Sequence, residues 1–168
     1  MRNVIAAAAL LVTSPALAGT APDAAPVASA CAGPEFKQLD FWLGEWDVRW
    51  LDSPGTPAGQ GTNHITRTHD GCVTEEHFDG GDLKGHSISI YHAPAKAWRQ
   101  NWVDNQGGYF DLKGGPEENG DFVLTTLPRA SSPAANRMIF TDIKPDTFTW
   151  RWQRTMDGKT WDDSWVIY

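Results

Sequence analysis

The nine tryptophans of this 168-residue chain recur at short, regular spacings. Most are two or four positions from the next one: Trp42, Trp46 and Trp50; Trp98 and Trp102; Trp150 and Trp152; Trp161 and Trp165. Side chains at positions i, i+2 and i+4 of a β-strand point to the same face of the sheet. The spacing therefore predicts strands whose indoles gather on one side, and a sheet rolled into a barrel would collect them in one interior.

Short alternating segments continue to the end of the chain. In 45–50 the apolar residues Trp46, Val48 and Trp50 alternate with charged ones, and no apolar repeat of helical period follows. Glycine, proline, asparagine or aspartate separates the segments. We predict an all-β fold, an antiparallel up-and-down barrel of about ten strands, preceded by a short helical turn at 34–39. The later strands are expected at 61–68, 72–78, 85–92, 97–104, 108–113, 121–127, 136–143, 147–155 and 160–167.

The pair Asp70-Gly71 predicts a two-residue turn, because both central residues of a type I′ turn take a positive φ. Such a turn fixes the register of the two flanking strands. One face then pairs Asn63 with Phe78, Ile65 with Glu76, and Arg67 with Thr74; the other pairs His64 with His77 and Thr66 with Glu75. The face with Ile65 and Phe78 is the more apolar of the two, so we expect it to be the inner one.

The pair Asp157-Gly158 predicts a second turn of the same kind. It places Trp152 opposite Asp163, Trp150 opposite Trp165, and Phe148 opposite Ile167. This face is strongly apolar and is expected inside the barrel.

Several polar side chains share the predicted inner face with these aromatic residues. Gln100 and Asp104 alternate with Trp98 and Trp102 on another strand. A solid core rejects unpartnered polar groups, whereas a cavity accepts them. We therefore predict a pocket for a small molecule, with these candidate ligand-binding residues: Asn63, Arg67, Glu76, Gln100, Trp102, Trp150 and Trp152. The alternatives are an interior Arg67–Glu76 ion pair that fixes the register, and tryptophans that only fill a core.

The first residues resemble a secretory signal peptide. Arg2 precedes an apolar run from Val4 to Val12, and Ala16-Leu17-Ala18 fits the small-residue cleavage rule. We expect a signal peptide at 1–18, cleavage after Ala18, a flexible linker at 19–33 and a barrel domain at 34–168. The protein would then be periplasmic or secreted, with no stable insertion in the membrane.

An exported chain with two cysteines is expected to form a disulfide, here between Cys31 and Cys72. The alternative, in which both are metal ligands, lacks the neighbouring Cys or His that zinc sites use. The net charge of −7 disfavours a nucleic-acid partner, which needs a basic surface.

Two further patterns bear on chemistry. His64 and His77 face each other beside Glu75, a set that could bind a metal, although a surface histidine pair is the simpler interpretation. The sequence contains no Walker motif, HExxH motif or Gly-rich phosphate loop.

The motif Leu39-Asp40-Phe41-Trp42-Leu43-Gly44-Glu45-Trp46 resembles the G-x-W opening of lipocalins and nitrobindins. Together with Gly71-Cys72-Val73, the segment 98–104 and the segment 157–161, it is similar to an exported bacterial calycin-like family of unknown function. The resemblance implies an eight- to ten-stranded barrel with a cavity, and no particular activity. Nitrobindins bind haem through a late histidine, but all five histidines here precede residue 93, so we expect no haem and no other cofactor.

Three functions follow from these patterns. The first is binding of a small, partly hydrophobic molecule in an aromatic-lined cavity, without catalysis. The second is an isomerase or hydrolase that uses Glu76 or Asp104 as acid or base. The third is a carbohydrate-binding module, which needs exposed coplanar tryptophans.

Overall fold

The computed structural model describes residues 29–53, 56–128 and 131–168. The predicted signal peptide and the linker up to residue 28 lie outside the described residues. The 3-10 turns are η1 (Pro34–Lys37), η2 (Asp40–Trp42), η3 (His69–Gly71) and η4 (Ala93–Ala95). The strands are β1 (Gly44–Trp50), β2 (Gly59–Thr68), β3 (Val73–Asp79), β4 (Lys84–His92), β5 (Ala97–Asp104), β6 (Tyr109–Pro116), β7 (Phe122–Thr126), β8 (Ala135–Lys144), β9 (Thr147–Thr155) and β10 (Asp162–Ile167).

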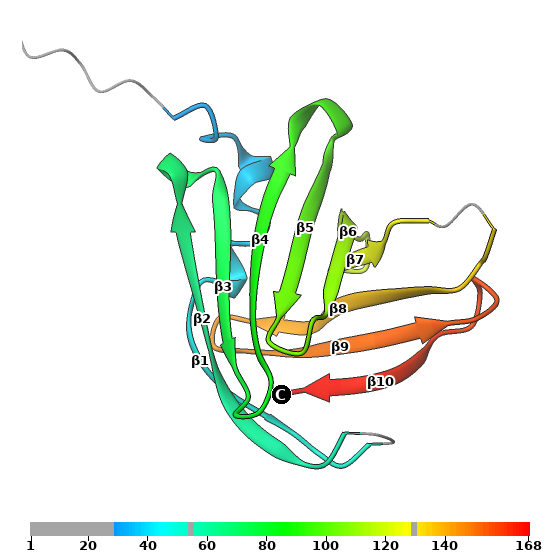
Figure 1. Ribbon diagram of the computed structural model, residues 1–168. Helices are drawn as coiled ribbons and strands as arrows, with labels where there is room; N and C mark the ends of the chain where they lie inside the picture. Colours follow the sequence, from blue (N-terminus) through cyan, green and yellow to red (C-terminus); the bar gives the residue numbers. More distant parts are fainter. Residues whose placement is uncertain (1–28, 54–55, 129–130) are drawn as a thin grey trace, which may run out of the picture.

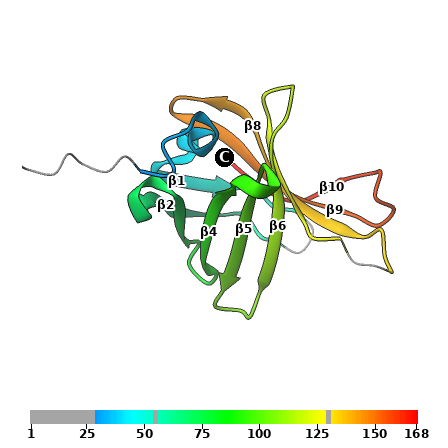
Figure 2. The same ribbon diagram turned by 90° about the horizontal axis from the view of Figure 1, so that it is seen from above.

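All ten strands belong to one antiparallel sheet in which spatial order follows chain order (Figure 1). The sheet curls until its first and last strands meet, as the view from above shows (Figure 2). Arg49 and Tyr168 exchange two backbone hydrogen bonds of 3.0 and 2.9 Å at that seam. The predicted fold class, an up-and-down barrel of about ten strands with a helical turn before it, is confirmed. Within the described residues no helix is long and apolar enough to cross a membrane.

The β2–β3 hairpin has the predicted register. Asn63 pairs with Phe78, Ile65 with Glu76 and His64 with His77. Asp70 and Gly71 have φ of 55° and 92°, and the backbone N–H of Cys72 donates to the carbonyl of His69. These are the features of the expected type I′ turn.

The predicted β9–β10 register is wrong. Trp165 pairs with Trp152 rather than with Trp150, and a bulge lies between Asp163 and Trp165. The carboxylate of Asp157 accepts hydrogen bonds from the backbone N–H groups of Lys159 and Thr160, both at 2.8 Å. These bonds hold a wider loop in place of a two-residue turn, so the strands pair later along the chain.

The segment before β1 closes one end of the barrel. The predicted disulfide between Cys31 and Cys72 is present and ties this segment to the β2–β3 turn. In the chain-entropy model, a bridge between residues 41 positions apart stabilises the fold by roughly 4 kcal/mol. Leu39 and Trp42, exposed by only 0% and 2%, enter the end of the barrel as a plug.

Two hydrophobic clusters fill the interior. The larger lies around the plug and consists of Leu39, Trp42, Ile65, Trp98, Leu112, Phe122, Leu124, Met138 and Phe140. The smaller consists of Val48, Trp50, Phe78 and Ile167. Residues of both clusters line one cavity, which therefore lies between them.

Candidate ligand-binding cavity

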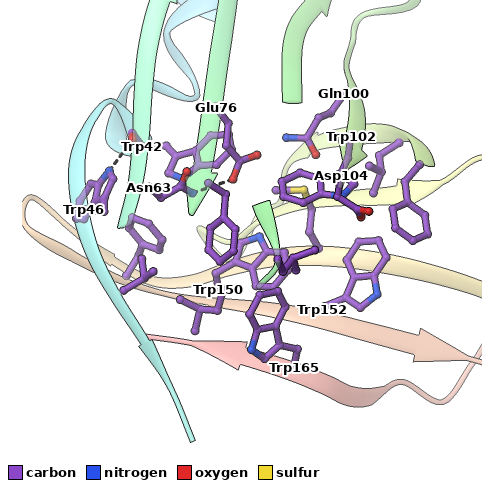
Figure 3. Close-up of a pocket in the computed structure, with 18 residues that line it drawn as sticks. Trp42, Trp46, Asn63, Glu76, Gln100, Trp102, Asp104, Trp150, Trp152 and Trp165 are labelled. Atoms are coloured by element: carbon purple, nitrogen blue, oxygen red, sulfur yellow. Dashed lines mark hydrogen bonds between the residues drawn. The ribbon is translucent and has the colours of Figure 1, made fainter. Parts of the chain in front are cut away.

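The cavity has a volume of about 220 Å³. Figure 3 shows the polar side chains Asn63, Glu76 and Gln100 on one side of it and the indoles of Trp150, Trp152 and Trp165 on another. The lining residues come from nearly every part of the barrel: Trp42, Trp46, Val48, Asn63, Glu76, Phe78, Leu83, Gln100, Trp102, Asp104, Phe110, Leu112, Met138, Phe148, Trp150, Trp152, Trp165 and Ile167. A second hollow, of about 400 Å³, shares the side chains of Phe110 and Trp152 with it.

Six of the seven predicted ligand-binding residues line the cavity: Asn63, Glu76, Gln100, Trp102, Trp150 and Trp152. Arg67 is the one that does not. Its guanidinium pairs with the carboxylate of Asp40 and donates to the carbonyls of Phe36 and Gly71. The alternative Arg67–Glu76 ion pair is therefore also wrong. Arg67 lies two residues beyond Ile65 on β2, near the β2–β3 turn. Its long side chain therefore contacts the segment before β1 rather than the cavity.

Glu76 is the centre of a buried polar group. Its Oε1 accepts from Asn63 Nδ2 at 2.8 Å, and its Oε2 accepts from Ser87 Oγ at 2.6 Å. Burial raises the pKa of Glu76 from 4.5 to about 7, and the two hydrogen bonds oppose that shift without cancelling it. Near neutral pH this side chain can hold a proton or release it into the cavity.

Asp104, the other predicted acid–base candidate, is held differently. Its carboxylate accepts from the indole N–H of Trp102 at 3.0 Å and from the backbone N–H groups of Gln106 and Gly108 at 2.9 and 2.8 Å. Desolvation opposes ionisation, but these three donors outweigh it and lower the pKa of Asp104. Asp104 thus fixes the β5–β6 turn and orients Trp102, and it is a poor proton donor.

Two polar atoms of the lining have no hydrogen-bond partner among the described residues. They are Asn63 Oδ1, an acceptor, and Trp165 Nε1, a donor. Asn63 is exposed by only 8%. Buried polar atoms are nearly always paired. Because both of these atoms are fully covered, a molecule in the cavity can pair with them only if the two side chains shift.

The aromatic wall is built from the neighbouring strands β9 and β10, together with Phe110 of β6, which is three strands from β9 in the sheet. Trp150 and Trp152 stack with an interplanar angle of 8°, and Trp165 meets Trp150 edge-on with ring centroids 5.7 Å apart. Phe110 packs against Trp152 at 4.9 Å. The predicted inner face of these strands is correct, and its indoles border open space as well as one another.

The tryptophans do not form the exposed platform that a carbohydrate-binding module needs. Trp42 and Trp98 are buried, and the guanidinium of Arg137 lies 4.3 Å from the centre of the Trp161 ring. All nine tryptophans are among the described residues, and none is largely exposed.

Sequence reasoning missed part of the polar group and part of the lining. Ser87 pairs with Glu76 across β3 and β4. Gly80-Gly81 marks the turn between β3 and β4 in the sequence. It does not define the length of that turn, however, so the β3–β4 register could not be predicted. Trp42 reaches the cavity from a 3-10 turn outside the alternating strands, where no strand pattern could place it.

The candidate metal ligands on the outer face also differ from the expected set. His64 and His77 are opposite each other, as predicted. The group whose ligand atoms all lie within 4.8 Å of one another is instead Glu75, His77 and His86. His86 was missed because it is opposite His77 in the β3–β4 pair, and the register of that pair was not predicted from the sequence.

No family model matches the chain, and no curated protein matches it.

Proposed function

We propose that this protein binds a small, largely apolar molecule in the barrel lumen. One observation carries the proposal: an aromatic cavity of about 220 Å³ is lined by the polar side chains of Asn63, Glu76 and Gln100 as well as by indoles. Concave, mostly apolar sites with a few polar groups are typical of small-molecule binding.

The lining also indicates the chemistry of the ligand. A flat or aromatic body fits against Trp150 and Trp152, whose rings are parallel. A shift of the Asn63 and Trp165 side chains would let a hydrogen-bond donor on the ligand pair with Asn63 Oδ1 and an acceptor pair with Trp165 Nε1. A neutral ligand, or one that carries a positive charge beside an ionised Glu76, suits the site better than an anion, because no cationic side chain lines the cavity in the described residues.

Glu76 supports catalysis as a second candidate function. A carboxyl group with a pKa of about 7 in a ligand cavity is suited to general acid–base work. The enzyme would be an isomerase or hydrolase acting on the molecule that occupies the lumen. Turnover in a panel of small metabolites that Glu76→Gln abolishes, with ligand affinity retained, would establish this activity. Binding without turnover would leave ligand binding as the function of the lumen.

We further propose that the chain is exported and belongs with the calycin-like barrels. The disulfide supports export, because cytosolic thiols are usually kept reduced. The ten-stranded meander and its cavity are what the resemblance of the Leu39–Trp46 segment implies, and they support this part of the proposal.

The neutral amine N-phenyl-1-naphthylamine is a suitable probe, since it has a naphthalene ring system, a phenyl ring and one N–H donor. We expect saturable binding of one probe per chain, seen as increased probe fluorescence. Trp102→Ala removes one wall of the cavity and should weaken binding by about tenfold or more, or about 1.4 kcal/mol. Trp161→Phe is the matched control, because Trp161 is outside the cavity lining.

Thermal unfolding of each variant shows that it is folded before it is titrated. Wild-type protein that gives no saturable signal would overturn the proposal. So would equal affinities of wild type, Trp102→Ala and Trp161→Phe, because the probe would then bind somewhere else.

A further inference from the structure

The outer face of the barrel carries a cluster of side chains unrelated to the lumen. His77 on β3 and His86 on β4 are directly opposite each other, and their ring centroids are 4.6 Å apart. Glu75 lies two residues before His77 and so shares its face. One ligand atom from each of the three side chains lies within 4.8 Å of the other two.

The strand pairing holds this cluster in place. The neighbours Glu76 and Ser87 point inward and are buried, which turns Glu75, His77 and His86 outward. All three side chains stand on hydrogen-bonded central strands rather than on loops. Glu75 is restrained further, because Thr68 Oγ1 donates to its Oε1 at 2.9 Å and His69 Nδ1 lies 3.9 Å from the same oxygen, whereas Oε2 has no hydrogen-bond partner in the described residues.

The electrostatic surroundings favour a cation. Glu75 supplies a negative charge beside two imidazoles, and the chain as a whole carries −7. Lys84 lies two residues before His86 on β4. Its positive charge is paired with the carboxylate of Asp79 on β3.

We propose that Glu75, His77 and His86 bind a divalent transition-metal ion of the zinc class. Two imidazoles and one carboxylate are ligands that zinc accepts, and water completes the coordination at this exposed site. Zinc bonds of about 2.0–2.1 Å place ligand atoms about 3.3 Å apart, so modest side-chain rotation from separations below 4.8 Å closes the site.

His64 is the natural test of this assignment. It is opposite His77 on the other side, on β2, but it is outside the group of three. If the site is the one proposed, His86 matters for the metal and His64 does not. If the metal were instead shared by His64, His77 and His86 across β2, β3 and β4, both His64 and His86 would matter.

The experiment is a calorimetric titration of Zn²⁺ into the chelator-stripped, untagged, disulfide-bonded protein. We expect one ion per chain, and a loss of about tenfold or more in affinity, or about 1.4 kcal/mol, in His77→Ala and in His86→Ala. His64→Ala and His92→Ala, at exposed positions on β2 and β4, should stay close to wild type.

Thermal unfolding supplies the folding control. With a chelator present, all four variants should melt close to wild type, and added Zn²⁺ should raise the melting temperature of wild type but not of His86→Ala. Absence of a one-to-one ion in the wild type would overturn the site. A loss in His64→Ala or His92→Ala as large as that in His86→Ala would overturn it too.

Discussion

Glu76 is the residue on which the chemistry of the lumen depends. Between its unfolded pKa of 4.5 and its folded pKa of about 7, the folded chain keeps a proton that the unfolded chain has released. The free energy of unfolding therefore falls as pH rises through this window. Glu76→Gln removes that dependence. The free energy of unfolding of the variant, minus that of wild type, should therefore rise by about 3 kcal/mol as the pH goes from 4 to 8.

Urea unfolding of both proteins at pH 4, 6 and 8 measures this gain. Glu45→Gln, at an exposed position on β1, provides the baseline for replacing a glutamate. Parallel curves for wild type and Glu76→Gln across this pH range would show that burial does not raise the pKa of Glu76 in the folded protein.

At the scale of elements, β4 and β5 fit together because of one glycine. Gly85 pairs with Asp104, and a Cβ built on it would overlap the indole ring of Trp102. Gly85→Ala should therefore push this indole off its position, lower stability by about 1–3 kcal/mol and weaken binding of the naphthylamine probe. Gly115→Ala is the control, since the nearest atom to its Cβ would be Trp98 Cδ1 at 3.8 Å.

Chemical denaturation and the probe titration together check this prediction. A Gly85→Ala protein with wild-type stability and affinity would mean that Trp102 is free to move, and that it does not form a fixed wall.

Elements with local signals were predictable, and those set by distant contacts were not. The register of β2 and β3 follows from Asp70-Gly71 alone, so the placement of Asn63 and Glu76 was correct. The same dipeptide at Asp157-Gly158 failed, because the Asp157 side chain bonds the loop backbone. Arg67 was misplaced because its partners, Phe36 and Asp40, belong to a segment outside the strand pattern.

At the scale of the whole molecule, the barrel is plugged at one end and hollow toward the other. Polar side chains such as Asn63, Glu76 and Gln100 on the predicted inner faces indicated a cavity, and the barrel contains one. Its size could not be predicted, because it depends on how far Leu39 and Trp42 enter the barrel and on how both clusters pack. Unpartnered atoms such as Asn63 Oδ1 are likewise visible only once all neighbours are placed.

Native mass spectrometry of the protein purified from its own host tests the occupied lumen most directly. We predict one small guest per chain, lost in Trp102→Ala and kept in Trp161→Phe. Wild-type protein that shows only the mass of the bare chain, and forms no one-to-one complex when N-phenyl-1-naphthylamine is added, would contradict a ligand-binding barrel.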